Sequence, residues 1–122
     1  MNKHATIYER KGKIFIGTDS LTTAGIWLGD GQITLLQSLD IPYEIGSAVL
    51  AALANSRGGV HHPEQHEWSS LLKELMKPLY IAAGVKSWSA FQSDARCITV
   101  NLHEGIIIIE PSKKKMAAVM GL

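Results

Sequence analysis

The sequence predicts an α+β fold, in which an antiparallel sheet of about six strands in three hairpins carries two or three helices packed on one face. Three observations lead to this prediction: β-rich stretches at both ends of the chain, turn residues between them, and a central region with helical periodicity. A chain of 122 residues has the length of one domain. We therefore expect a single domain over 1–122, with 113–122 as a flexible tail.

The first half of the chain is typical of hairpins. Residues 6–10 and 13–17 are rich in β-branched and aromatic residues, and a Lys-Gly pair between them suits a tight turn. Two more apolar stretches, 24–28 and 32–36, are separated by Gly29-Asp30-Gly31, in which the Asp-Gly pair tolerates positive φ. These stretches predict four strands in two hairpins.

Helical periodicity begins near residue 41, where apolar residues start to recur at steps of three and four and continue to Leu53. Asp40 is placed to cap this helix, and Pro42 suits its first turn. The glycines at 58 and 59 follow its end, where a left-handed residue is favoured.

A second apolar stripe runs from Trp68 to Leu79 and predicts a helix that begins near Pro63 and ends at Gly84. Pro78 lies inside this stripe. Because proline removes a backbone donor and its ring crowds the preceding turn, we expect a kink or a break there.

The C-terminal part of the chain returns to β-structure. Ser87 is placed to cap a single helical turn that ends near Phe91. Residues 95–102 alternate between apolar and polar types, a turn follows at 103–105, and 106–109 are four consecutive isoleucines. These stretches predict a third hairpin, which Pro111 terminates.

The composition excludes several classes of protein. When the lysines at 113–115 are left out, the chain has nine basic and eleven acidic residues. The rest of the chain therefore lacks the excess of positive charge that is typical of a nucleic-acid-binding protein. The single cysteine, Cys97, forms no disulfide framework and indicates a reducing compartment. The polar N-terminus lacks the apolar stretch of a signal peptide, and the run 45–54 is too short to span a membrane. We expect a soluble cytoplasmic protein.

The stretch GGVHHPEQHEW, residues 58–68, concentrates groups that could carry chemistry. His62 and His66 are four residues apart, and two histidines with this spacing on one helix can bind the same metal ion. The proline after His62, however, moves that histidine out of helical geometry. We interpret the stretch as an exposed polar loop and the acidic start of the next helix. A small metal-dependent hydrolase or nuclease that uses the cluster His61, His62 and His66 stays open as the alternative.

No other motif points to an enzyme. The sequence has no G-x-S-x-G nucleophile elbow and no phosphate-binding loop, and Cys97 falls in a predicted strand as a small buried residue. We expect no catalytic residues, no metal ion and no cofactor.

Two stretches carry a resemblance to a known family. The segment TIYERKGKIFIGTDS followed by GIWLG, at 6–29, and the segment AAGVKSWSAFQSDARCITV, at 82–100, resemble immunity proteins of bacterial contact-dependent growth inhibition (CDI) systems. The helix end ALANSRGGVHHP lies between them. Of these stretches, Gly84 to Trp88, with Phe91 and the strand that follows, is the most distinctive.

The resemblance implies a cytoplasmic, non-enzymatic immunity domain that binds the C-terminal toxin domain of an effector delivered by a neighbouring cell. Many such toxins are nucleases, commonly acting on tRNA. We expect a one-to-one protein complex with no direct contact to nucleic acid or membrane. Because a nuclease is basic where it holds phosphate, the immunity protein should present acids and hydrogen-bonding histidines. The candidates on predicted loops and helix starts are Asp19, Asp30, Glu44, His61, His62, Glu64, His66 and Glu67.

Overall fold

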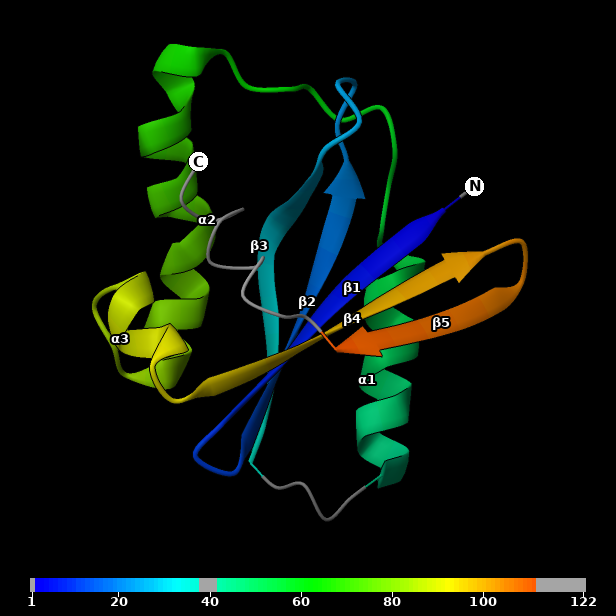
Figure 1. Ribbon diagram of the computed structural model, residues 1–122, viewed down its shortest axis with the longest axis vertical. Helices are drawn as coiled ribbons and strands as arrows, with labels where there is room; N and C mark the ends of the chain where they lie inside the picture. The colour runs from blue at the N-terminus through cyan, green and yellow to red at the C-terminus, as the bar shows by residue number, and fades with distance from the viewer. Residues whose placement is uncertain (1, 38–41, 112–122) are drawn as a thin grey trace.

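The computed structural model describes residues 2–37 and 42–111 and contains five strands, three α-helices and one turn of 3-10 helix (Figure 1). The strands are β1 (Lys3–Arg10), β2 (Lys13–Leu21), β3 (Trp27–Leu36), β4 (Ala95–His103) and β5 (Ile106–Pro111). The helices are α1 (Pro42–Ala54), η1 (Gln65–Glu67), α2 (Trp68–Ala83) and α3 (Trp88–Gln92). The predicted cap Asp40 and the predicted tail 113–122 lie outside the described residues.

The strands form one antiparallel sheet in the order β3-β2-β1-β4-β5. The predicted α+β class, with helices packed against an antiparallel sheet, is confirmed. The N-terminal hairpin turns at Lys11-Gly12, both with positive φ, and the C-terminal hairpin turns at Glu104-Gly105 in the same way. Both turns were predicted from their glycines. Because β4 pairs with β1, the two hairpins lie side by side, and β3 and β5 form the edges of the sheet.

The helices lie on both faces of the sheet. The prediction that they all pack on one face of the sheet is therefore wrong. Figure 1 shows α1 on one side of the sheet, with α2 and α3 on the other. Ile14 and Ile16 pack under α1, whereas Phe15, between them, packs against α2 and α3. Successive side chains of a strand point to opposite faces, so a strand buried on both faces has a continuous apolar sequence.

The predicted strands 24–28 and 32–36 form parts of one strand, β3, so the described residues contain five strands. The turn between β2 and β3 falls earlier, where Thr22 N–H donates to Ile26 O and Gly25 has a φ of +83°. The register shifts between Gly17 and Asp19 of β2, which pair with Ile33 and Gly29. The Gly-Asp-Gly stretch is therefore an irregularity within β3, because pairing with β2 overrides the local turn preference.

The second helical region differs from its prediction in two ways. The α-helix begins at Trp68, after η1, so His66 lies in a 3-10 turn and residues 61–64 have no regular structure. The helix then continues through Pro78, so of the predicted kink or break the break does not occur. Proline removes one hydrogen bond there, but Leu79, which is 2% exposed, anchors the next turn in the core. Gly84 ends α2 in the left-handed conformation, as predicted.

Candidate functional site

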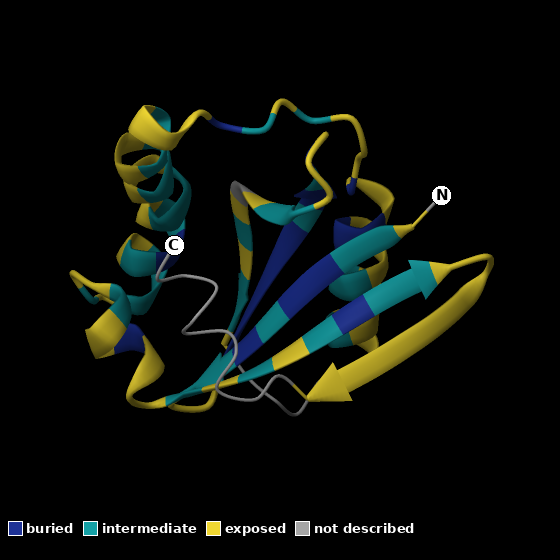
Figure 2. Ribbon diagram, turned by 45° about the horizontal axis from the view of Figure 1, so that its top comes forward, coloured by how far each residue is buried: buried dark blue, intermediate teal, exposed yellow. Residues whose placement is uncertain are grey.

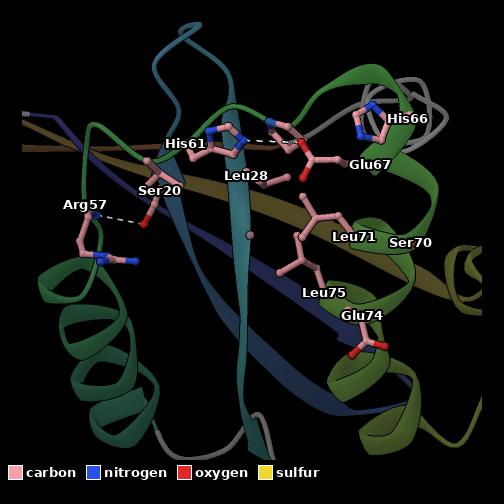
Figure 3. Close-up of a pocket in the computed structure, with 13 residues that line it drawn as sticks. Ser20, Leu28, Arg57, His61, His66, Glu67, Ser70, Leu71, Glu74 and Leu75 are labelled. Atoms are coloured by element: carbon pink, nitrogen blue, oxygen red, sulfur yellow. Dashed lines mark hydrogen bonds and ion pairs between the residues drawn. The ribbon is translucent and has the colours of Figure 1, made fainter.

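The candidate site is a groove of about 630 Å³ between the first turns of α2 and the end of α1 (Figure 3). We call it the α2 groove. Its walls are the start of β3, the loop after α1, and the exposed face of η1 and α2. It is lined by Ser20, Leu28, Gly29, Arg57, Val60, His61, Pro63, His66, Glu67, Ser70, Leu71, Glu74 and Leu75.

The loop after α1 is fixed to the end of β2 by backbone hydrogen bonds. Leu21 donates to Arg57 O at 2.7 Å, Val60 N–H donates back to Leu21 O at 3.1 Å, and Thr23 N–H donates to Val60 O at 2.9 Å. The hydroxyl of Ser20 accepts the Arg57 N–H at 3.0 Å. This wall of the groove is therefore held in place before any partner binds.

Histidine and glutamate side chains form the rim above this loop. The Nε2 atom of His61 lies 3.6 Å from Oε1 of Glu67, and the same oxygen accepts the backbone N–H of Glu64 at 2.8 Å. The hydrogen bond from Glu64, and then the contact with His61, lower the pKa of Glu67 below its ordinary value. Glu67 is therefore an anion with a fixed orientation at neutral pH, and it faces the groove.

The titration of Glu67 tests this geometry. A carboxyl group whose pKa is lower in the folded state stabilises the fold above its unfolded pKa, and this contribution is lost as the pH falls through the folded value. We expect carbon NMR to give a midpoint below 4.5, the ordinary value, for Glu67. In His61→Ala the midpoint should rise but stay below 4.5, because the Glu64 N–H remains. A wild-type midpoint at or above 4.5 would contradict the arrangement.

The structure brings three of the predicted contact residues, His61, His66 and Glu67, to the α2 groove. His62 lies behind the rim, where its Nδ1 is 3.1 Å from the Thr22 hydroxyl and its ring meets the edge of Trp68 at 5.4 Å. Glu64 is the remaining predicted contact residue of this stretch, and its backbone N–H donates to Glu67 and holds that side chain in place.

The other three predicted acids do not line the groove. Asp19 is turned into the protein, where its Oδ2 lies 2.5 Å from His4 Nδ1 and accepts the Thr6 hydroxyl at 2.6 Å. Its side chain is only 14% exposed. Asp30 belongs to β3, and Glu44 lies in the exposed first turn of α1.

Two charged residues of the groove were missing from the sequence candidates. Glu74 lies seven residues after Glu67, and positions separated by seven residues share one helical face. That periodicity was a usable signal. Arg57 gave no such signal, because its place opposite α2 depends on the pairing of its loop with β2. Figure 3 shows Arg57 on the α1 side of the groove and both glutamates on the α2 side.

The arrangement offers no metal centre within residues 2–37 and 42–111. In that part of the chain no three histidine, cysteine or acidic side chains are grouped closely enough to hold a metal ion. His61 faces Glu67, whereas His62 faces Thr22 and Trp68, so the histidines have separate partners. The groove instead combines an apolar floor of leucines with charged walls.

Comparison with known proteins identifies the family. A family model described as CDI immunity protein matches residues 3–119. The chain belongs to the CDI immunity protein family. The resemblance seen in the sequence is thereby confirmed over nearly the whole chain, and membership in this family supports a toxin-neutralising role. Comparison with curated proteins gives no match.

Two solved structures share the fold of this CDI immunity family member. One is a protein of unknown function from Neisseria meningitidis, with a TM-score of 0.75 and 23% identity, over 92% of this chain and 73% of that one. The other is a CdiA-CT/CdiI toxin and immunity complex from Yersinia pseudotuberculosis, with a TM-score of 0.72 and 18% identity, over 94% of this chain and 76% of that one. At these identities the likeness concerns the fold.

Within the described residues, no helix combines the length and the apolar character needed to cross a membrane.

Proposed function

We propose that this protein neutralises the toxin domain of a CDI effector in the cytoplasm by forming a one-to-one complex, and that it does so without catalysing a reaction. The match of the family model over residues 3–119 carries this proposal. The fold shared with a chain of the Yersinia toxin and immunity complex agrees with it. The alternative, a metal-dependent hydrolase, is not supported, because His61, His62 and His66 belong to no group of side chains that could hold a metal ion within the described residues.

We further propose that the α2 groove is the docking surface for the toxin. Its floor of Leu28, Leu71 and Leu75 can take an apolar side chain, while its rim offers charged groups for orientation. Its loop wall is fixed by hydrogen bonds to β2, so little ordering entropy is lost on binding. A specific interface buries roughly 1,200–2,000 Å² in total, so the contact would extend from the groove over the rim.

The charges of the groove favour a toxin with a basic surface. Glu67 and Glu74 lie on one wall, and Arg57 on the opposite wall is the cation among the lining residues. His61 and His66 can donate hydrogen bonds beside them. A nuclease, such as one that cleaves tRNA, is basic where it holds phosphate, so this wall would complement it and speed association. We therefore propose a nuclease as the toxin.

Co-expression tests the proposal directly. The cognate toxin domain, taken from the end of the effector gene that neighbours this one, is produced from an inducible promoter with or without the protein. We expect cells to survive only when the protein is present and the two chains to co-purify in a one-to-one ratio. Death of cells that contain both folded proteins, or substrate turnover by the purified protein alone, would refute the proposed function.

A further inference from the structure

The hydroxyl of Ser56 ties the loop after α1 into the sheet. Ser56 is 2% exposed, lies two residues beyond the end of α1, and directly precedes Arg57 of the α2 groove. Its Oγ accepts the backbone N–H of His4 at 3.1 Å and donates to the backbone oxygen of Asp19 at 2.5 Å. Figure 2 shows buried stretches in β1 and β2, the two strands that it joins. One buried hydroxyl therefore binds the loop to two strands.

This bridge lies at a defined position of the β1–β2 hairpin. His4 and Asp19 are register partners in the hairpin. Its two-residue turn is flanked by Arg10 and Lys13, and from there hydrogen-bonded pairs alternate with non-bonded pairs. By this alternation His4 and Asp19 are one of the hydrogen-bonded pairs. The Ser56 hydroxyl bonds to the donor of one and to the acceptor of the other, so it fixes the loop at a single residue pair of the ladder.

The next residue of the loop continues this register. Arg57 N–H donates to the Ser20 hydroxyl at 3.0 Å, and Arg57 O accepts the Leu21 N–H at 2.7 Å. Residues 56 and 57 therefore bond to three consecutive residues of β2, 19 to 21. Figure 3 shows the bond between Arg57 and Ser20 at the wall of the α2 groove. A slip of the loop by one residue along β2 would move the Arg57 side chain out of this wall.

We propose that Ser56 is a positioning residue for toxin recognition, because its hydroxyl sets the register in which the loop lies on β2 and thereby places Arg57 in the α2 groove. This inference rests on the proposed docking of the toxin in that groove. Arg57 is the cation among the lining residues, and its guanidinium can donate to a carboxylate or a backbone carbonyl of the toxin. Ser56 is buried, so it acts through Arg57 and not by touching the toxin.

Hydrogen exchange on the free protein tests the positioning without the toxin. In Ser56→Ala the amides of Arg57 and Val60, which bond to β2, should exchange at least about tenfold faster than in wild type, because the loop has lost its anchor. The matched control is Thr18→Val, which removes another buried hydroxyl of β2, one that donates to Ala52 O in α1 at 2.8 Å. This control should leave both amides within about threefold of wild type, because the loop keeps its own bonds.

Calorimetry with the cognate toxin domain gives the second readout. Ser56→Ala and Arg57→Ala should each weaken binding about tenfold, and the double variant should bind within about threefold of Arg57→Ala alone, because Ser56 acts through Arg57. Thr18→Val, and Ser56→Thr, which keeps the hydroxyl, should bind within about threefold of wild type. Ser56→Cys, whose thiol is a weak donor and acceptor, repeats the test if Ser56→Ala does not fold.

The outcomes separate this inference from the proposed docking surface. Equal exchange of the two amides in wild type and Ser56→Ala would overturn the inference and leave the docking surface standing. Losses of affinity that multiply in the double variant would also overturn it, because Ser56 would then act independently of Arg57. Full affinity in Arg57→Ala would instead refute the role of this wall in docking, and the inference would fall with it.

Discussion

Reversing both glutamates of the α2 groove, in Glu67→Lys/Glu74→Lys, should weaken toxin binding at least about a hundredfold and abolish protection of cells. The two acids share one helical face and line the same wall. Lysines in their place would face the basic surface proposed for the toxin, and like charges opposed across an interface cost several kcal/mol. Binding is measured by calorimetry, and protection is measured by survival after the toxin is induced.

The matched control is Glu44→Lys/Glu104→Lys, which makes the same charge change at exposed acids outside the groove. This control should bind within about threefold of wild type, because distant exposed charges are screened by salt. Equal affinity of the groove variant and the control would show that the α2 groove is not the docking surface. The proposal of toxin neutralisation would survive that result, provided that wild type still protects cells.

Replacing Phe91 with alanine should lower the free energy of unfolding by about 3–5 kcal/mol. Phe91 is fully buried, and its ring meets Phe15 at 5.6 Å and Tyr8 at 5.1 Å, both edge-to-face. It also stacks on Trp88 at 5.7 Å, so one side chain ties α3 to β1 and β2. A loss of this size is a large part of the stability of a small domain. The change in the free energy of unfolding is measured by urea denaturation, with circular dichroism as the signal.

The control for this core variant is Ile81→Ala, which removes an apolar side chain that is 72% exposed on α2. Its free energy of unfolding should stay within about 0.5 kcal/mol of wild type. A loss below about 1 kcal/mol in Phe91→Ala would contradict the packing of α3 against the sheet.

Part of the candidate site could be predicted from the sequence. The density of histidines and acids in 58–68 pointed to the rim of the α2 groove, and His61, His66 and Glu67 do line it. Asp19 was chosen as an acid in a polar loop, but β2 continues through it and its carboxylate is paired with His4. That pairing joins two neighbouring strands, β1 and β2, and a local pattern does not contain it.

The sequence by itself determined the order and the type of the elements. Glycines marked the turns at 11–12 and 104–105 and the end of α2, apolar periodicity marked the helices, and alternation marked β4, because these features depend on neighbouring residues only. The tertiary structure alone decided that β3 is one strand, that the helices divide between two faces, and that Arg57 lies opposite Glu74. Each of these depends on contacts between residues far apart in the chain, whose free energy exceeds the local preferences of a few residues.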